Sequence, residues 1–116
     1  MRYILLLYGD EQAWAAMSPE EQGSQLQAYD EYTRWLKDKG WFEGGEPLHA
    51  TSSATTVRVR DDETLTTDGP FAETKEYLGG LYLVECDNLD EAIEFASKIP
   101  AARTGGAIEV RPVIEH

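Results

Sequence analysis

The side chains best suited to chemistry are concentrated in one run, Thr67-Asp68-Gly69-Pro70-Phe71-Ala72-Glu73-Thr74-Lys75-Glu76-Tyr77. A turn-forming Asp-Gly-Pro is followed there by an aromatic residue, and then by two carboxylates and an ammonium group within four residues. A connection that only reverses the chain usually takes two to five residues. The length and charge of this segment, residues 67–77, which we call the connector, therefore indicate a functional site.

Two interpretations of Asp68 are open. In the first, its carboxylate accepts backbone N–H groups further along the chain and closes an Asx turn, although Pro70 removes one donor. In the second, the carboxylate is a general base or a ligand anchor at the mouth of a cavity. Lys75 or Tyr77 then supplies the proton donor, so Asp68 and Lys75 are the candidate catalytic residues.

The candidate ligand-binding residues are Asp68, Phe71, Glu73, Glu76 and Tyr77. We expect Phe71 to anchor the connector to the core, with the lining of a pocket as the alternative. Glu73, Lys75 and Glu76 form a carboxylate–ammonium group with perturbed pKa values if they are partly buried. If they are not, they form a solvated charged surface. Tyr77 is either a phenol donor to a ligand or a packed aromatic residue.

Neither a metal site nor a cofactor is expected. Asp68, Glu73 and Glu76 carry oxygen ligands that suit a hard cation, but their spacing matches no known metal-binding loop. The histidines are His49 and His116, and the role of His49 stays open. The chain contains no phosphate-binding glycine loop and no nucleophile elbow.

The bulk composition argues against several classes of partner. The chain has 116 residues, the size of one domain, and we expect residues 1–116 to form a single domain. Its 22 acidic and 10 basic side chains give a formal net charge of -12. This charge repels phosphate backbones and anionic lipid headgroups, so neither nucleic-acid binding nor membrane binding is expected.

Two further features predict a cytoplasmic protein. The single cysteine, Cys86, cannot form an intramolecular disulfide, and its apolar surroundings indicate a buried, inert thiol. The apolar run Tyr3–Tyr8 is too short for the core of a signal peptide. No stretch of the sequence is long and apolar enough to span a bilayer.

Periodicity and capping signals place the elements around the connector. We expect strands at residues 3–8, 41–48, 55–60, 63–67, 79–86 and 107–114, and helices at 18–39 and 88–99, with a short helical turn after Asp10. Ser18 and Glu21 form a capping box, and a second one begins at Asn88. The packing face of the first long helix is expected to carry Leu26, Tyr29, Thr33 and Leu36.

This order of elements predicts a fold. Strand, helix, strand, hairpin, strand, helix and strand form a ferredoxin-like α+β sandwich, in which one antiparallel sheet carries two helices on one face. The other face of the sheet is then bare. Because residues 3–8 and 81–86 are apolar on both faces, we expect a second subunit to cover that face and form a homodimer.

The sequence resembles the YCII-related superfamily and, within it, the group named for its Asp-Gly-Pro-Phe (DGPF) motif, present here as Asp68-Gly69-Pro70-Phe71. The resemblance covers the whole chain and rests on segments 2–11, 54–60, 67–76, 89–92, 99–100 and 109–113. It implies a dimeric α/β barrel, in which two ferredoxin-like sheets pack through their bare faces. Some YCII-related proteins have been proposed as enzymes because of a His–Asp pair, to which neither histidine here aligns.

Two functions follow from the residues and the resemblance together. The first is that of a bacterial YCII-related protein with a small-molecule binding site, or a cofactor-independent enzymatic site, beneath Thr67–Tyr77. The alternative is a non-catalytic regulatory or interaction module that works with a sigma-factor pathway partner, because some group members lie beside sigma factors. That alternative predicts an exposed acidic patch and no enclosed cavity.

Overall fold

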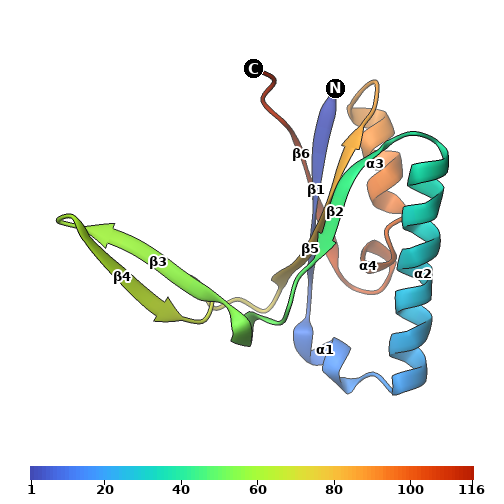
Figure 1. Ribbon diagram of the computed structural model, residues 1–116. Helices are drawn as coiled ribbons and strands as arrows, with labels where there is room; N and C mark the ends of the chain where they lie inside the picture. Colours follow the sequence, from blue (N-terminus) through green and yellow to red (C-terminus); the bar gives the residue numbers. More distant parts are fainter.

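The computed structural model describes residues 1–116 of the chain (Figure 1). The elements are β1 (Arg2–Gly9), α1 (Glu11–Ala16), α2 (Pro19–Asp38), β2 (Phe42–Pro47), the 3-10 helix η1 (Thr51–Ser53), β3 (Thr55–Arg60), β4 (Glu63–Asp68), β5 (Tyr77–Glu85), α3 (Leu89–Ser97), α4 (Pro100–Arg103) and β6 (Ala107–Pro112). No helix is long and apolar enough to cross a membrane.

Four strands form one antiparallel sheet in the order β2-β5-β1-β6. The long helix α2 and the shorter helix α3 lie on the same side of this sheet (Figure 1). This arrangement is the expected ferredoxin-like α+β sandwich. We call the sheet with α2, α3 and α4 the body of the molecule.

Local capping explains where the two main helices begin. The Ser18 side chain accepts a hydrogen bond from Glu21 N, and the Glu21 carboxylate accepts one from Ser18 N, so the expected capping box is confirmed. At α3, Asn88 accepts from Glu91 N, but the Glu91 carboxylate accepts from Asp87 N. The second expected capping box is therefore incomplete, and Asn88 acts as a simple N-cap.

The core lies between the sheet and the two helices. Its buried side chains are Tyr3, Leu5, Leu7, Tyr32, Leu36, Tyr82, Val84, Cys86, Ala92, Phe95, Ala96 and Ile99. The expected burial of Cys86 is confirmed. The expected burial of Leu26 is wrong, because Leu26 is 56% exposed and the face of α2 turned to the core carries Tyr32, whose hydroxyl donates to the Phe95 carbonyl at 2.8 Å.

The hairpin formed by β3 and β4 does not join the main sheet, which corrects the expectation of one sheet. Its strands pair only with each other, from Thr55 opposite Asp68 to Arg60 opposite Glu63. Figure 1 shows this hairpin, residues 55–68, projecting from one end of the body on the side away from the helices. We call it the arm. The predicted hairpin is confirmed, but the alternation of apolar and polar residues does not specify which sheet a strand joins.

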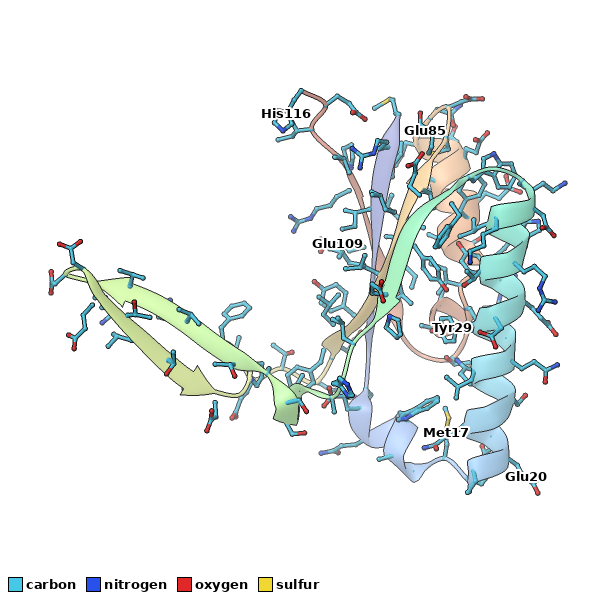
Figure 2. All side chains as sticks on the ribbon, in the orientation of Figure 1. Met17, Glu20, Tyr29, Glu85, Glu109 and His116 are labelled. Atoms are coloured by element: carbon cyan, nitrogen blue, oxygen red, sulfur yellow. The ribbon has the colours of Figure 1, made fainter.

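The face of the main sheet that lacks helices carries a stripe of half-buried apolar side chains. Ile4 and Leu6 of β1 are paired with Leu83 and Leu81 of β5, and all four alternate with residues that pack on the helices. Glu109 of the edge strand β6 lies on this same face, pointing away from the helices (Figure 2). We call this surface the bare face.

Candidate functional site

An open groove of about 890 Å³ lies where the arm joins the body. Its lining comes from three places in the sequence: Tyr8 at the end of β1, most of residues 48–56 around η1, and most of residues 70–78 in the connector and the start of β5. These segments are far apart in the sequence. The groove is therefore a product of the fold, and about half of its lining residues are hydrophobic.

Four residues expected from the sequence meet in this lining: Phe71, Lys75, Glu76 and Tyr77. Asp68 and Glu73 are not part of the lining. The ends of the connector are also more regular than expected, because Asp68 ends β4 and Tyr77 begins β5. Only residues 69–76 connect the two strands.

The Asx turn, which is the first of the two interpretations of Asp68, does not form. The Asp68 carboxylate is exposed and accepts no hydrogen bond, whereas Gly69 N donates to the Ala54 carbonyl at 2.7 Å. Gly69 has a φ of 98°, a left-handed conformation that glycine adopts without steric cost. Asp68 is the cross-strand neighbour of Thr55, which lines the groove, so its carboxylate stands beside the groove.

Phe71 is 80% exposed, so the expected anchoring of the connector in the core is wrong. The connector is held by hydrogen bonds instead of apolar packing. Thr56 Oγ1 donates to the Gly69 carbonyl at 2.8 Å, and Thr74 Oγ1 donates to the Glu76 carbonyl. Phe71 is thereby left on the wall of the groove, where an aromatic ring can stack on a ligand.

The phenol of Tyr77 is oriented by the connector itself. Thr74 N donates a hydrogen bond to Tyr77 Oη at 3.2 Å. Because this oxygen accepts from the backbone, its own proton is free to point elsewhere. Tyr77 lines the groove, so a ligand oxygen there can accept that proton in a hydrogen bond.

The charged groups of the connector are exposed and form no ion pair. Lys75 lies in the groove lining, yet no carboxylate approaches its ammonium group within 4.0 Å. Glu73 and Glu76 are likewise exposed and unpaired. This agrees with the interpretation of the connector as a solvated charged surface, and it leaves the Lys75 ammonium group available to an anion.

Sequence reasoning missed the segment that forms the opposite wall of the groove. His49 and Thr51 belong to this segment, and both line the groove. The Glu11 carboxylate accepts hydrogen bonds from Thr51 N and Thr51 Oγ1, each at 2.8 Å, and so ties η1 to α1. His49 could be noticed in the sequence as a rare residue type, but nothing local indicated its position.

No group of three His, Cys, Asp or Glu side chains is arranged to hold a metal ion.

The tyrosines whose pKa values are shifted lie in the core or pack against it. Burial raises the pKa of Tyr32, Tyr29 and Tyr82, and Tyr82 Oη shares a hydrogen bond of 2.8 Å with Thr33 Oγ1. Burial also raises the pKa of the Cys86 thiol, which donates to the Asn88 carbonyl. These groups are structural, because each is buried in the core or packs against it and already has a hydrogen-bond partner.

The topology and the groove define the class: a ferredoxin-like α+β protein with an open groove at one end of its sheet. The chain belongs to the YCII-related domain family, whose profile matches residues 1–116. An uncharacterized protein of Rhizobium meliloti (strain 1021) is 40% identical over 114 residues, covering 97% of this chain and 92% of that protein. The expected membership of the YCII-related superfamily is confirmed.

A solved structure shares the fold. It is the 5-chloro-2-hydroxyhydroquinone dehydrochlorinase TftG from Burkholderia phenoliruptrix AC1100, in complex with 2,5-dihydroxybenzoquinone. The TM-score is 0.58, and the match covers 100% of this chain and 96% of that chain at 16% sequence identity. At this identity the likeness shows the fold alone.

Proposed function

We propose that the groove binds a small, planar molecule that carries negatively charged or hydrogen-bond-accepting oxygens. The observation that carries this proposal is the lining: an unpaired ammonium group (Lys75), an oriented phenol (Tyr77) and an exposed aromatic ring (Phe71) border one groove of about 890 Å³. Pockets for small molecules combine apolar walls with a few polar groups in this way. The alternative regulatory module excludes only an enclosed cavity, and this groove is open, so the choice between the two functions rests on the residues of the lining.

The quinone bound to TftG supports this choice of ligand class. A hydroxyquinone is flat and has oxygens at opposite edges, so one face can stack on Phe71 while an edge accepts hydrogen bonds from Lys75 and Tyr77. Glu76 lies in the same lining and can accept a hydrogen bond from a ligand hydroxyl. Glu73 lies outside it and is proposed to bind only ligands that extend beyond the groove.

Catalysis is the further step of the proposal. A cofactor-independent reaction needs a proton donor and a proton acceptor near the ligand. Lys75 is the proposed donor, and the acceptor is either Asp68 beside the groove or His49 within its lining.

The proposal includes a homodimer formed through the bare face. Ile4, Leu6, Leu81 and Leu83 form an apolar stripe there, with Glu109 at its border, which is the pattern of an interface with an apolar centre and a polar rim. We also propose that the chain belongs to the DGPF group of the family. A sedimentation measurement that finds only 13.0 kDa particles at all concentrations would contradict the dimer.

Ligand binding is tested by titrating the 15N-labelled protein with 2,5-dihydroxybenzoquinone. We expect shifts in the amide resonances of residues 48–56 and 70–78. Lys75→Gln is expected to weaken binding by about tenfold, because one charge-assisted hydrogen bond is lost. Lys98→Gln, which changes a lysine on the helical side of the body, is the matched control and should bind as the wild type does. No shifts, or equal affinity in Lys75→Gln, would refute the site.

Exchange of the ring hydrogens of the same probe for deuterium, followed by 1H NMR in D2O, distinguishes the two proton acceptors, because the acceptor removes one proton and a solvent deuteron replaces it. If His49 is the acceptor, His49→Gln abolishes the reaction and Asp68→Asn leaves most of it. If Asp68 is the acceptor, the two results are exchanged. Binding without exchange under any condition would restrict the protein to a ligand-binding role.

A further inference from the structure

The arm presents an apolar face that nothing else in the chain covers. Val57 and Val59 are two residues apart in β3, so their side chains lie on one face of the hairpin, together with those of their cross-strand partners Thr66 and Thr64. Their exposed fractions are 59% and 65%. An isolated two-stranded hairpin is only marginally stable in water. A partner that packs on this face would stabilise the arm.

The arm and the bare face border the same space. Figure 1 shows the arm leaving the end of the sheet on the side opposite to α2 and α3. Ile4 and Leu6 point to that side, because their neighbours Leu5 and Leu7 are buried against the helices. A molecule seated on the bare face therefore lies in the angle between sheet and arm, where it can contact both.

The arm is long enough to extend past a second domain that packs on the bare face. The radius of gyration is 16.0 Å, whereas a compact chain of this length has about 13 Å. Each strand of the arm has six residues and spans roughly 20 Å. Packed sheets lie about 10 Å apart. The arm is thus long enough to cross a facing sheet and reach the surface of the molecule that contains it.

We propose that the arm clasps a second copy of this chain and that Val57 and Val59 pack on the body of that copy. The inference rests on the homodimer proposed above and adds the arm as a second part of its interface. Two-fold symmetry makes the contact reciprocal, so each copy contributes one arm and receives the other.

The charges on the bare face favour a second copy over a basic partner. Arg2 is paired with Glu85 across β1 and β5, and Arg111 forms an ion pair with Glu109 on β6. Both signs of charge therefore border the apolar stripe. When such a face meets its own two-fold copy, a positive group can approach a negative one despite the net charge of -12.

The double substitution Val57→Lys and Val59→Lys tests the clasp by sedimentation equilibrium. We expect the dissociation constant of the dimer to rise at least about 100-fold, because two apolar contacts are replaced by charges. The control Leu65→Lys and Thr67→Lys puts the same two charges on the opposite face of the arm, where Leu65 is paired with Arg58 and Thr67 with Thr56, and should change the constant by less than about threefold. Added lysines reduce the net negative charge, so general repulsion cannot explain dissociation.

A second variant tests the clasp in a way that does not require the substituted arm to fold. Gly69 N lies 2.7 Å from the Ala54 carbonyl, so residues 55–68 can be deleted and Ala54 joined to Gly69 with little rearrangement. We expect the deletion to keep the far-ultraviolet circular dichroism of the body and to weaken the dimer at least as much as the double lysine variant.

The outcomes separate this inference from the proposed function. A dimer of unchanged affinity in both arm variants would overturn the clasp while leaving the bare-face dimer standing. A wild-type chain that is monomeric at all concentrations would overturn both. If the wild type does not bind the quinone but the arm variants dissociate as expected, the proposed ligand site is refuted and the clasp stands.

Discussion

The body and the arm are built from strands of similar length, yet different forces hold them. In the body, alternate residues of β1 and β5 are buried against helices, and aromatic rings such as Trp41 and Phe95 stack with centroids 4.3 Å apart. In the arm no residue is buried, and the two strands hold each other only by their mutual pairing. The body therefore has a hydrophobic core, whereas the arm has none.

This difference separates local pattern from tertiary role. Val57 and Val59 alternate with charged residues as regularly as strand residues that face a core. Their strand nevertheless packs on nothing within the chain, because no element folds back over it (Figure 2). Regular alternation of apolar and polar residues thus indicates a strand with one apolar face, but it does not indicate what packs on that face.

The largest expected effect is in the body. Phe95→Ala removes a ring that is 1% exposed and stacks on Trp41, so we expect it to lower the free energy of unfolding by about 3–5 kcal/mol. Leu65→Ala in the arm should cost less than about 1 kcal/mol. Urea unfolding followed by tryptophan fluorescence measures both. Similar costs at the two positions would remove the distinction between body and arm.

A pair of glycine substitutions sharpens the description of the body. In Gly106→Ala the new methyl group would lie 2.5 Å from the Tyr8 carbonyl oxygen and 2.8 Å from that of Ala101, so we expect a loss of roughly 1–3 kcal/mol. Gly23→Ala on α2 meets no atom within 4 Å and should stabilise the helix by up to about 1 kcal/mol. Thermal unfolding measures both changes. A Gly106→Ala protein as stable as the wild type would contradict the close approach of Gly106 to the Tyr8 and Ala101 carbonyl oxygens.

Alkaline pH is expected to weaken the body through its buried phenols. Burial raises the pKa of Tyr32 above its ordinary value of 10.0, so the stability contributed is fully present below pH 10 and is lost as pH rises further. Tyr32→Phe should remove part of this loss, and it should cost about 1 kcal/mol at pH 7 because the hydrogen bond to the Phe95 carbonyl disappears.

Stability of Tyr32→Phe and the wild type is compared by urea unfolding between pH 7 and pH 11. The arm contains no tyrosine, so the amide exchange of residues 55–68, corrected for intrinsic rate, is the internal control. Identical pH profiles for the two proteins would show that Tyr32 does not resist ionisation.

The smallest expected effect lies at the tip of the arm. Asp61 and Asp62 have φ values of 50° and 62°, which is the left-handed geometry of a tight hairpin turn. Asp62→Gly should relieve strain there and stabilise the arm by roughly 0.5–1 kcal/mol. Slower amide exchange in β3 and β4, with unchanged exchange in the body, would confirm it. Faster exchange in the arm would show that the aspartate is preferred.

The sequence was informative wherever a few neighbouring residues determine the outcome. Ser18 and Glu21 predicted the start of α2, the alternation from Thr55 predicted the hairpin, and the buried Cys86 was read from its apolar neighbours. The order of these elements then predicted the ferredoxin-like sandwich, because short connections and helical crossovers of one hand leave few other arrangements. The prediction that Leu26 packs on the core was wrong, because the spacing of apolar residues in α2 is compatible with more than one buried face.

The candidate site was recovered in part. Phe71, Lys75, Glu76 and Tyr77 meet in one groove, as their closeness in sequence suggested. The other part of the lining was missed, because His49 and its neighbours come to this groove only through the positions of β2 and η1. Phe71 was placed in the core since its side chain is apolar, but the connector has no core to reach.

By itself, the amino-acid sequence determined the helices, the strands, the order that makes the sandwich, and the connector with its charged and aromatic side chains. Caps, turns and alternation act over a few residues, so they can be read locally. Only the tertiary structure decided that residues 55–68 stand apart from the sheet and that His49 lines the same groove as the connector. Both depend on where distant segments meet, and no local pattern encodes that meeting.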